Sequence, residues 1–259
     1  MTKAFVFDLD ETIGHFEELS ILDYTIKNHI GKEIKKSDFF KIMDLFPHIF
    51  RPNIFNIFKY LRDKKIATNG SKNKNKIKIM IYTNNTGCRM WANRIKSYIE
   101  KKINYKLFDR TICAWKYDNK ILEKNRTGYD KRYFDLLKCG HLKKSDKIIF
   151  LDDTLFEKMI HPNVTYLHLI PYKYTYGNMI NKYINQENSL LKDKKLIKSY
   201  SKKSICKNNN TELFNLKGKK IERHIKKFFE QSNNKTIKKY NSKKNKTRKK
   251  MKIKEYYKI

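Results

Sequence analysis

Short apolar runs that end in polar residues alternate, along the first two thirds of the chain, with segments whose apolar residues recur at helical spacing. The apolar runs predict buried strands at five places, residues 3–9, 77–82, 110–115, 147–151 and 164–170. The helical spacing predicts one or two short helices within 17–46, and longer helices that start after Pro52 and near Met90. Strands that alternate with helices predict an α/β fold with a doubly wound, Rossmann-like parallel sheet.

Acidic side chains directly follow two of the expected strands. Asp8 and Asp10 come at the end of the first strand, and Asp152 and Asp153 follow the strand at 147–151. The carboxyl ends of parallel strands lie at one edge of the sheet, where ligands of such folds bind. Carboxylates gathered there would repel one another and raise their own pKa values unless a cation neutralised them. Oxygen ligands favour Mg²⁺ over zinc, so a magnesium site is expected at this edge.

The same residues suit phosphoryl transfer, because proteins usually bind Mg²⁺ through one or two carboxylates together with a phosphate. Asp8 can attack phosphorus as a nucleophile, and Asp10 can protonate the leaving oxygen and then activate water. Thr83 follows the strand at 77–82 and can donate a hydrogen bond to a phosphoryl oxygen, although a helix N-cap would also explain a threonine there. A lysine would neutralise the transferring group, and Lys131 is the candidate.

Four short segments occur in the order and at the spacing of the four motifs of a known superfamily. They are DLDET at residues 8–12, YTNN around Thr83, a downstream lysine, and FLDDT around Asp152. The chain therefore resembles the haloacid dehalogenase superfamily, which implies a haloacid dehalogenase-like α/β domain. The resemblance covers residues 1–172 and leaves the rest of the chain unexplained.

Other segments resemble particular branches of this superfamily. FRPNIFNIFKYL at 50–61 and MWANRIKSYI at 90–99 resemble the phosphatases that act on the RNA polymerase C-terminal domain, although Asn53 stands where those proteins usually have glycine. The stretch from Arg126 to Tyr172 resembles phosphatase-like proteins of large DNA viruses. The resemblance therefore implies a phosphatase, and a viral origin is expected.

The resemblance also implies a role for each matching side chain. The roles are nucleophile and metal ligand for Asp8, acid/base and carbonyl ligand of the metal for Asp10, phosphate binding for Thr83 and Asn84, metal ligand for Asp152, and outer-sphere metal binding for Asp153. The third motif supplies one cation, assigned to Lys131, which is expected to open a helix before the strand at 147–151. Arg126 and Lys138 are alternatives, because the chain is rich in basic residues.

The charge of the chain is extreme, since 60 Lys and Arg against 26 Asp and Glu give a net charge of +34. Residues 186–259 contain 25 Lys and Arg against 6 Asp and Glu, and only 221–229 has enough apolar residues for a short helix. We therefore expect a phosphatase domain over 1–185, with a small helical insert at 17–50, and a basic, largely disordered tail over 186–259. The tail is either a nucleic-acid-binding arm or an extension that reflects AT-rich coding sequence.

Nothing in the apolar pattern predicts export or membrane insertion. Asp8 and Asp10 interrupt the first apolar run, and no run approaches the roughly 18 to 20 apolar residues that span a bilayer. The four cysteines are scattered without zinc-site spacing. A cytoplasmic protein is expected, in the host cell or the virion if the chain is viral.

The expected function is Mg²⁺-dependent hydrolysis of a phosphomonoester through an aspartyl phosphate. The small insert would leave the site open, which favours a phosphate on a macromolecule, either a protein or a nucleic-acid end. The alternative is a non-catalytic protein of the same fold that binds nucleic acid through its basic tail. The presence of all the expected carboxylates favours the enzyme.

Overall fold

The centre of the molecule is a six-stranded sheet in the order β3-β2-β1-β6-β7-β8. The computed structural model describes residues 1–69, 76–87, 90–191, 210–230 and 256–259. The strands are β1 (Thr2–Phe7), β2 (Lys76–Tyr82), β3 (Arg110–Ile112), β6 (Lys147–Asp152), β7 (Val164–His168) and β8 (Tyr256–Lys258). Every neighbouring pair is parallel, which confirms the α/β fold with a doubly wound sheet.

The strand order reverses its direction between β1 and β6. From β1 the chain adds β2 and then β3 on one side, and then returns to add β6, β7 and β8 on the other side. Phe7 at the end of β1 pairs with Leu151 of β6, and the next amide, of Asp8, donates a hydrogen bond to Leu151 O at 2.9 Å. The topological switch point, where doubly wound sheets bind ligands, therefore lies where Asp8 and Asp152 end their strands.

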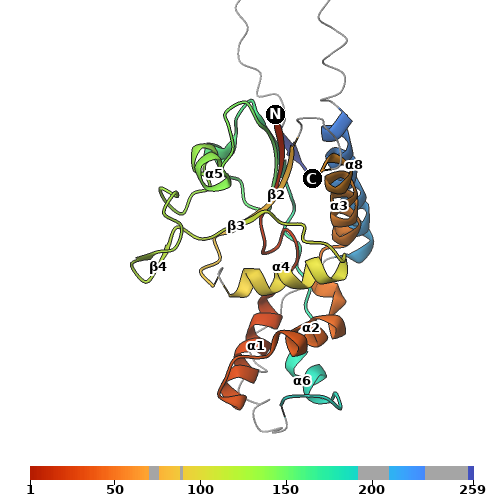
Figure 1. Ribbon diagram of the computed structural model, residues 1–259. Helices are drawn as coiled ribbons and strands as arrows, with labels where there is room; N and C mark the ends of the chain where they lie inside the picture. Colours follow the sequence, from red (N-terminus) through yellow and green to blue (C-terminus); the bar gives the residue numbers. More distant parts are fainter. Residues whose placement is uncertain (70–75, 88–89, 192–209, 231–255) are drawn as a thin grey trace, which may run out of the picture.

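The two faces of the sheet bury alternate residues of each strand. Phe5 and Phe7 of β1 belong to the larger core cluster, which packs under α3 (Ile54–Asn69), α4 (Trp91–Lys102) and α8 (Thr211–Glu230). Ala4 and Val6 belong to the second cluster, which α5 (Tyr133–Gly140) covers on the opposite side (Figure 1). This alternation follows from the period of two in a strand, and it explains why the strands are apolar throughout.

A small helical unit lies below the sheet in Figure 1. It contains α1 (Glu17–Ile30), α2 (Lys36–Leu45) and a 3₁₀ turn at Pro47–Ile49, which confirms the expected helices after the first strand. It also contains α6 (Met179–Ile184), which lies against α1 although it is distant in sequence. Aromatic contacts such as Phe40 with Tyr98 join this unit to α4.

Three smaller elements complete the described fold. The expected strand at 110–115 ends at Ile112, and a two-stranded hairpin follows it, made of β4 (Lys116–Tyr117) and β5 (Lys120–Ile121). A 3₁₀ turn, Glu157–Met159, follows β6. None of the helices in the described ranges combines the length and apolar character needed to cross a membrane.

Within the expected basic tail, the structure describes one helix that is longer than expected and one strand. Instead of a short helix over 221–229, α8 runs for 20 residues and buries Phe214, Ile221, Ile225 and Phe228 against the sheet. Burial of the apolar residues on one face stabilises this helix, while the charged residues on its other face stay in contact with water. Residues 256–258 form β8, the edge strand beside β7. Residues 192–209 and 231–255 of the expected tail lie outside the described residues.

Candidate active site

The ends of three neighbouring strands bring the predicted residues together. Asp8 follows β1, Asp152 is the last residue of β6, and Thr83 follows β2. All three side chains are buried, with Asp8 7%, Asp152 1% and Thr83 1% exposed. Hydrophobic strands that are covered on both faces fix the backbone at these points, so the polar side chains converge at one edge of the sheet.

Lys131 supplies the cation of this group. Its ammonium donates hydrogen bonds to Asp8 Oδ1 and, at 2.6 Å, to Asp152 Oδ2, and the residue is 1% exposed. Lys131 lies in the loop before α5, which begins at Tyr133, so it does not open the helix as expected. Its contacts with both carboxylates distinguish Lys131 from the other two candidates.

Arg126 and Lys138 have other surroundings. Lys138 is exposed on α5. Arg126 is buried, but its guanidinium donates hydrogen bonds to Thr83 O at 3.2 Å and to Asn84 Oδ1 at 2.7 Å, rather than to a carboxylate. Arg126 therefore holds the loop after β2 and positions Thr83 and Asn84 at the edge of the site.

Burial and mutual repulsion govern the charge of the carboxylates. Burial raises the pKa of Asp8 well above its ordinary value, with Lys131 opposing that rise and Asp152 adding to it. Burial also raises the pKa of Asp152, again against the effect of Lys131. Burial alone would lower the pKa of Lys131, but the two carboxylates raise it instead. One ammonium thus lies beside two buried carboxylates. When both carboxylates are ionised, the group carries a net negative charge that a further cation can neutralise.

Asp10 lies at the opening of the group. Its Oδ2 accepts a hydrogen bond from Asn85 Nδ2 at 3.1 Å, and burial raises its pKa although this hydrogen bond opposes the rise. Because a carboxyl group with a raised pKa keeps its proton closer to neutral pH, Asp10 is suited to general acid catalysis. Asn85 was not among the predicted site residues, although it belongs to the YTNN segment that contains Thr83.

Asp153 is held beside the Asp8 and Asp152 carboxylates by Thr12. Thr12 Oγ1 donates a hydrogen bond to Asp153 Oδ1 at 3.0 Å, and the Asp153 amide donates to the same hydroxyl at 3.1 Å. One oxygen from each of Asp8, Asp152 and Asp153 lies within 4.8 Å of the others. Three carboxylates with a single ammonium fit a hard divalent cation such as Mg²⁺, which prefers oxygen ligands. The side chain of Asp10 is outside this trio.

Thr83 points its hydroxyl into the loop that follows β2. Its Oγ1 accepts a hydrogen bond from the Asn85 amide at 2.9 Å, so the hydroxyl proton is available to another acceptor. The N-cap residue of α4 is Met90, which excludes a role for Thr83 as the cap of that helix. Thr83 and Asn84 thus lie at the site as expected.

An open cavity of about 450 Å³ contains these groups. Its walls come from the segments that follow β1, β2 and β6, together with Lys131 and Phe156. None of the described residues that line it comes from the helical insert at 17–50. Among the described residues, the insert therefore contributes no side chain to the wall of this cavity.

Arg51 fixes the turn that follows the first strand. The guanidinium is 2% exposed and donates hydrogen bonds to the carbonyl oxygens of Thr12 and Glu11, each at 2.6 Å, and of Ile170 at 2.8 Å. Asn53, two residues later, has a φ of 68°, which asparagine and glycine adopt most readily. The sequence indicated this segment only through its resemblance, and no role for Arg51 was predicted.

The sequence matches no protein-family model, and it matches no curated protein.

Proposed function

We propose that the chain is a Mg²⁺-dependent phosphomonoester hydrolase of the haloacid dehalogenase type, which acts through an aspartyl phosphate on Asp8. The observation that carries this proposal is the convergence of Asp8, Lys131 and Asp152 at the topological switch point of the sheet. A buried carboxylate beside a buried ammonium, at the end of a parallel strand, is suited to attack an anionic phosphoryl group.

The first step transfers the phosphoryl group to the enzyme. An oxygen of the Asp8 carboxylate forms a bond to phosphorus, and the bond between phosphorus and the substrate oxygen breaks. The leaving oxygen keeps the electron pair of that bond and takes the proton of Asp10. The raised pKa of Asp10 favours the protonated form that this step requires.

The second step returns the enzyme to its initial state. Asp10, now a carboxylate, takes a proton from water while the water oxygen attacks phosphorus. The bond between phosphorus and Asp8 breaks, and inorganic phosphate and the free Asp8 carboxylate are the products. Asn85, which donates a hydrogen bond to Asp10 at 3.1 Å, keeps the acid/base group in place through both steps.

The remaining residues bind the phosphoryl oxygens and balance charge. Lys131 and the hydroxyl of Thr83 are the donors, and Asn84 lines the same cavity. Asp8, Asp152 and Asp153 would hold Mg²⁺, together with the backbone carbonyl of Asp10 that the resemblance implies. The ion would supply positive charge against the negative charge of the phosphoryl group as it transfers.

The uncovered cavity supports a substrate whose phosphate belongs to a macromolecule, a protein or a nucleic-acid end. A small metabolite would gain little binding from a site that no insert closes. We propose a cytoplasmic location for this activity, in an infected host cell if the chain is viral.

Hydrolysis of an aryl phosphate, with and without Mg²⁺, tests the proposal on the parent protein and on Asp8→Asn. Turnover that needs Mg²⁺ and disappears in Asp8→Asn is the expected result. No Mg²⁺-dependent turnover in the parent, combined with binding of oligonucleotides that is the same in both proteins, would instead support the non-catalytic binding protein.

A further inference from the structure

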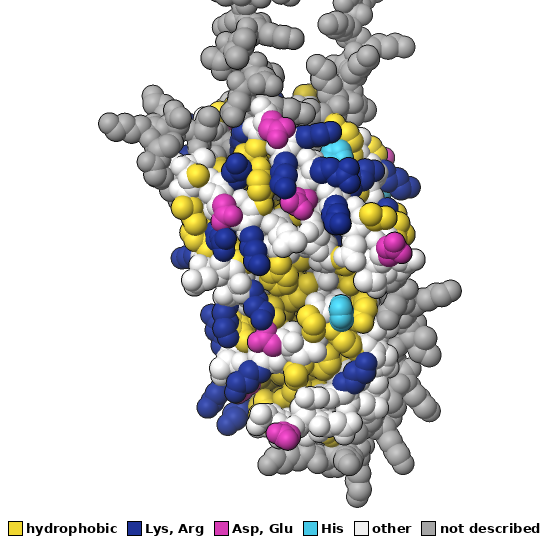
Figure 2. All heavy atoms as spheres, turned by 90° about the vertical axis from the view of Figure 1, so that its right-hand side faces the viewer, with side chains coloured by type: hydrophobic (Ala, Val, Ile, Leu, Met, Phe, Trp, Pro, Cys, Tyr) yellow, Lys and Arg dark blue, Asp and Glu magenta, His cyan; other side chains and the backbone are white. Residues whose placement is uncertain are grey.

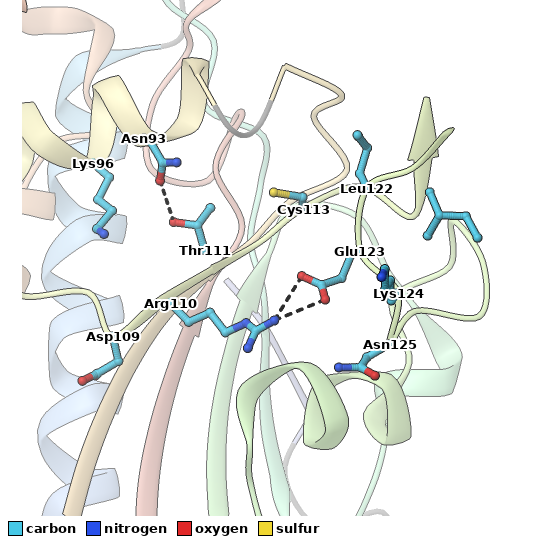
Figure 3. Close-up of a pocket in the computed structure, with 11 residues that line it drawn as sticks. Asn93, Lys96, Asp109, Arg110, Thr111, Cys113, Leu122, Glu123, Lys124 and Asn125 are labelled. Carbon is cyan, nitrogen blue, oxygen red and sulfur yellow. Dashed lines mark hydrogen bonds and ion pairs between the residues drawn. The ribbon is translucent and has the colours of Figure 1, made fainter. Parts of the chain in front are cut away.

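A second cavity, of about 570 Å³, lies beside the edge strand β3 (Figure 3). We call it the β3 cavity. Its polar lining comes from α4, from β3 and from the segment that follows the hairpin, and includes Asn93, Lys96, Arg110, Thr111, Glu123 and Lys124. The lining is mainly polar and carries charges of both signs, so its charge balance decides what it can bind.

Both acidic residues of the β3 cavity are already neutralised. Asp109 accepts a hydrogen bond from the buried Lys65 ammonium at 2.8 Å, and Glu123 pairs with Arg110 at 3.2 Å. Among the described residues, neither Lys96 nor Lys124 forms a salt bridge. The β3 cavity therefore offers two cations for an anion from outside the chain.

One guanidinium connects the β3 cavity with the catalytic cavity. Arg126 Nη1 donates a hydrogen bond to the carbonyl of Cys113, which lines the β3 cavity, at 2.7 Å. The same guanidinium donates to Thr83 O and to Asn84 Oδ1, and both of these residues line the catalytic cavity. The two cavities therefore have walls that one buried guanidinium holds together.

Aromatic side chains gather next to the β3 cavity, on the hairpin, just before it, and in the segment that leads to α5. The rings of Trp115 and Tyr129 lie 5.5 Å apart edge to face, and the Lys116 ammonium lies 4.7 Å from the Trp115 ring centre. The carbonyl of Trp115 accepts a hydrogen bond from the amide of Leu122, which lines the cavity. Tyr117 and Tyr129 are 59% and 49% exposed. Exposed rings next to lysines are typical of surfaces on which bases stack.

We infer that this surface, the β3 cavity with Trp115, Lys116, Tyr117 and Tyr129, binds a single-stranded nucleic acid whose terminal phosphate enters the catalytic cavity. The inference rests on the proposed function and names its substrate class. Backbone phosphates contact Lys96, Lys116 and Lys124, and bases stack on the exposed rings. A singly phosphorylated peptide would bring one anion and leave the β3 cavity without a partner, whereas each nucleotide brings a phosphate and an aromatic face.

Basic residues also cover the face formed by α3 and α8, which Figure 2 shows, and they provide a matched control. Lys59, Lys219 and Lys227 are exposed on these two helices. No described residue of α3 or α8 lines either the catalytic cavity or the β3 cavity. Binding that arose only from the high net charge would depend on both faces alike.

The test measures fluorescence anisotropy of a labelled single-stranded oligothymidylate with the full-length Asp8→Asn protein, without Mg²⁺, over a range of salt concentrations. Since each phosphate contact on a single strand adds about 0.7 to the slope of log K against log salt, replacing Lys96, Lys116 and Lys124 by Gln together should reduce that slope by about 2. Replacing Lys59, Lys219 and Lys227 by Gln should leave it unchanged. Equal reductions by the two triple variants would overturn the inference.

Two further comparisons identify the ligand. Tyr117→Ala and Tyr129→Ala should each weaken oligothymidylate binding about fivefold or more, since each removes a stacking surface. A terminal phosphate on the oligonucleotide should strengthen binding, with a 3′ or a 5′ phosphate as separate probes. Tighter binding of a phosphorylated acidic peptide than of the oligonucleotide, with the same sensitivity to the cavity lysines, would overturn the inference in favour of a protein substrate. Because binding is measured without turnover, it can succeed or fail independently of hydrolysis of an aryl phosphate.

Discussion

The Lys131 ammonium donates a hydrogen bond to Asp152 Oδ2 at 2.6 Å, and both side chains are almost completely buried. The same ammonium also contacts Asp8, so one cation lies between two carboxylates that end adjacent strands. Removing the ammonium would strongly destabilise the protein, because it would leave two buried carboxylates with no cation beside them. The stability of the fold and the chemistry of the site therefore depend on the same contact.

Lys131→Met should destabilise the metal-free protein by about 3 kcal/mol or more, since it leaves two buried carboxylates without their cation. Urea unfolding monitored by circular dichroism measures this change. Lys138→Met is the matched control: Lys138 lies exposed on α5, so its replacement should change stability by no more than about 0.5 kcal/mol. Equal effects of the two replacements would show that Lys131 is not the buried partner.

Asp8→Asn should stabilise the metal-free protein, and more so as the pH rises. Because burial raises the pKa of Asp8 in the folded state, the folded protein binds a proton more readily than the unfolded chain. The contribution of Asp8 to the free energy of unfolding is therefore fully present at or below the ordinary carboxyl pKa of about 4. It is lost as the pH rises through the raised pKa of the folded state. Asn carries no charge and has no such loss.

The difference in free energy of unfolding between Asp8→Asn and the parent isolates this effect, because all other titrating groups are common to both proteins. It should be smallest near pH 4 and should grow towards neutral pH. Saturating Mg²⁺ should reduce the difference, since a bound cation compensates the Asp8 charge in the parent. A difference that is constant with pH would contradict the assignment of a raised pKa.

Asp10→Asn should slow hydrolysis most for substrates whose leaving group needs a proton. For an alkyl phosphate, loss of a general acid lowers kcat by about 10² to 10⁴. A nitrophenyl phosphate, whose leaving group is stable as an anion, should be affected much less in the first step. Steady-state kinetics with both substrates measures the ratio, and equal losses for the two would place Asp10 outside the proton transfer.

Gly218 on α8 should not tolerate a larger residue. A Cβ there would lie 2.4 Å from the carbonyl oxygen of Pro52 and 2.8 Å from Cβ of Asn53. Gly218→Val should therefore destabilise the protein by about 1 to 3 kcal/mol through overpacking against the turn that contains Arg51. Thermal unfolding measures the loss.

Gly128→Ala serves as the control for this variant. A Cβ at Gly128 would have only the end of the Arg132 side chain within 4 Å, at 3.6 Å. Its replacement should leave the stability almost unchanged. If Gly218→Val were equally neutral, α8 would not be packed on the turn after Arg51, and its contribution to the core would have to be smaller than described.

Much of the sheet could be predicted because its strands are buried on both faces and are therefore continuously apolar. The strand at 77–82 and the strand at 147–151 differ by only one residue from β2 (Lys76–Tyr82) and β6 (Lys147–Asp152). The acidic residues at the ends of the strands at 3–9 and 147–151 were predicted to meet, and Asp8 and Asp152 do meet. A short run of consecutive apolar residues was therefore sufficient to predict each of these buried strands.

Long-range contacts could not be predicted in the same way. Three residues, Tyr256–Lys258, show no apolar run, and they are a strand only because β7 offers an edge for pairing. Lys131 could not be separated from Arg126 or Lys138 by spacing, since the difference lies in which side chain reaches the carboxylates. Asn85 likewise contacts Asp10 across 75 positions in the sequence.

The apolar face of α8 carried a signal that the high charge of the segment concealed. Phe214, Ile221, Ile225 and Phe228 recur at intervals of seven, four and three residues, which is helical spacing. The composition of 186–259 as a whole is dominated by lysine, so it does not reveal the apolar face of this one helix. A helix with one charged face and one apolar face is recognised from the spacing of its apolar residues, and not from the composition of the segment.

The most direct test of the account is to trap the phosphoryl group on Asp8. Protein mixed with an aryl phosphate and Mg²⁺ is quenched in acid during turnover and treated with borohydride, which reduces an acyl phosphate to an alcohol and releases phosphate. Peptide mass mapping should then find homoserine in place of aspartate at position 8, and only when both substrate and Mg²⁺ were present. Turnover without any modification at position 8, or with the modification at Asp10 or Asp152, would contradict the account.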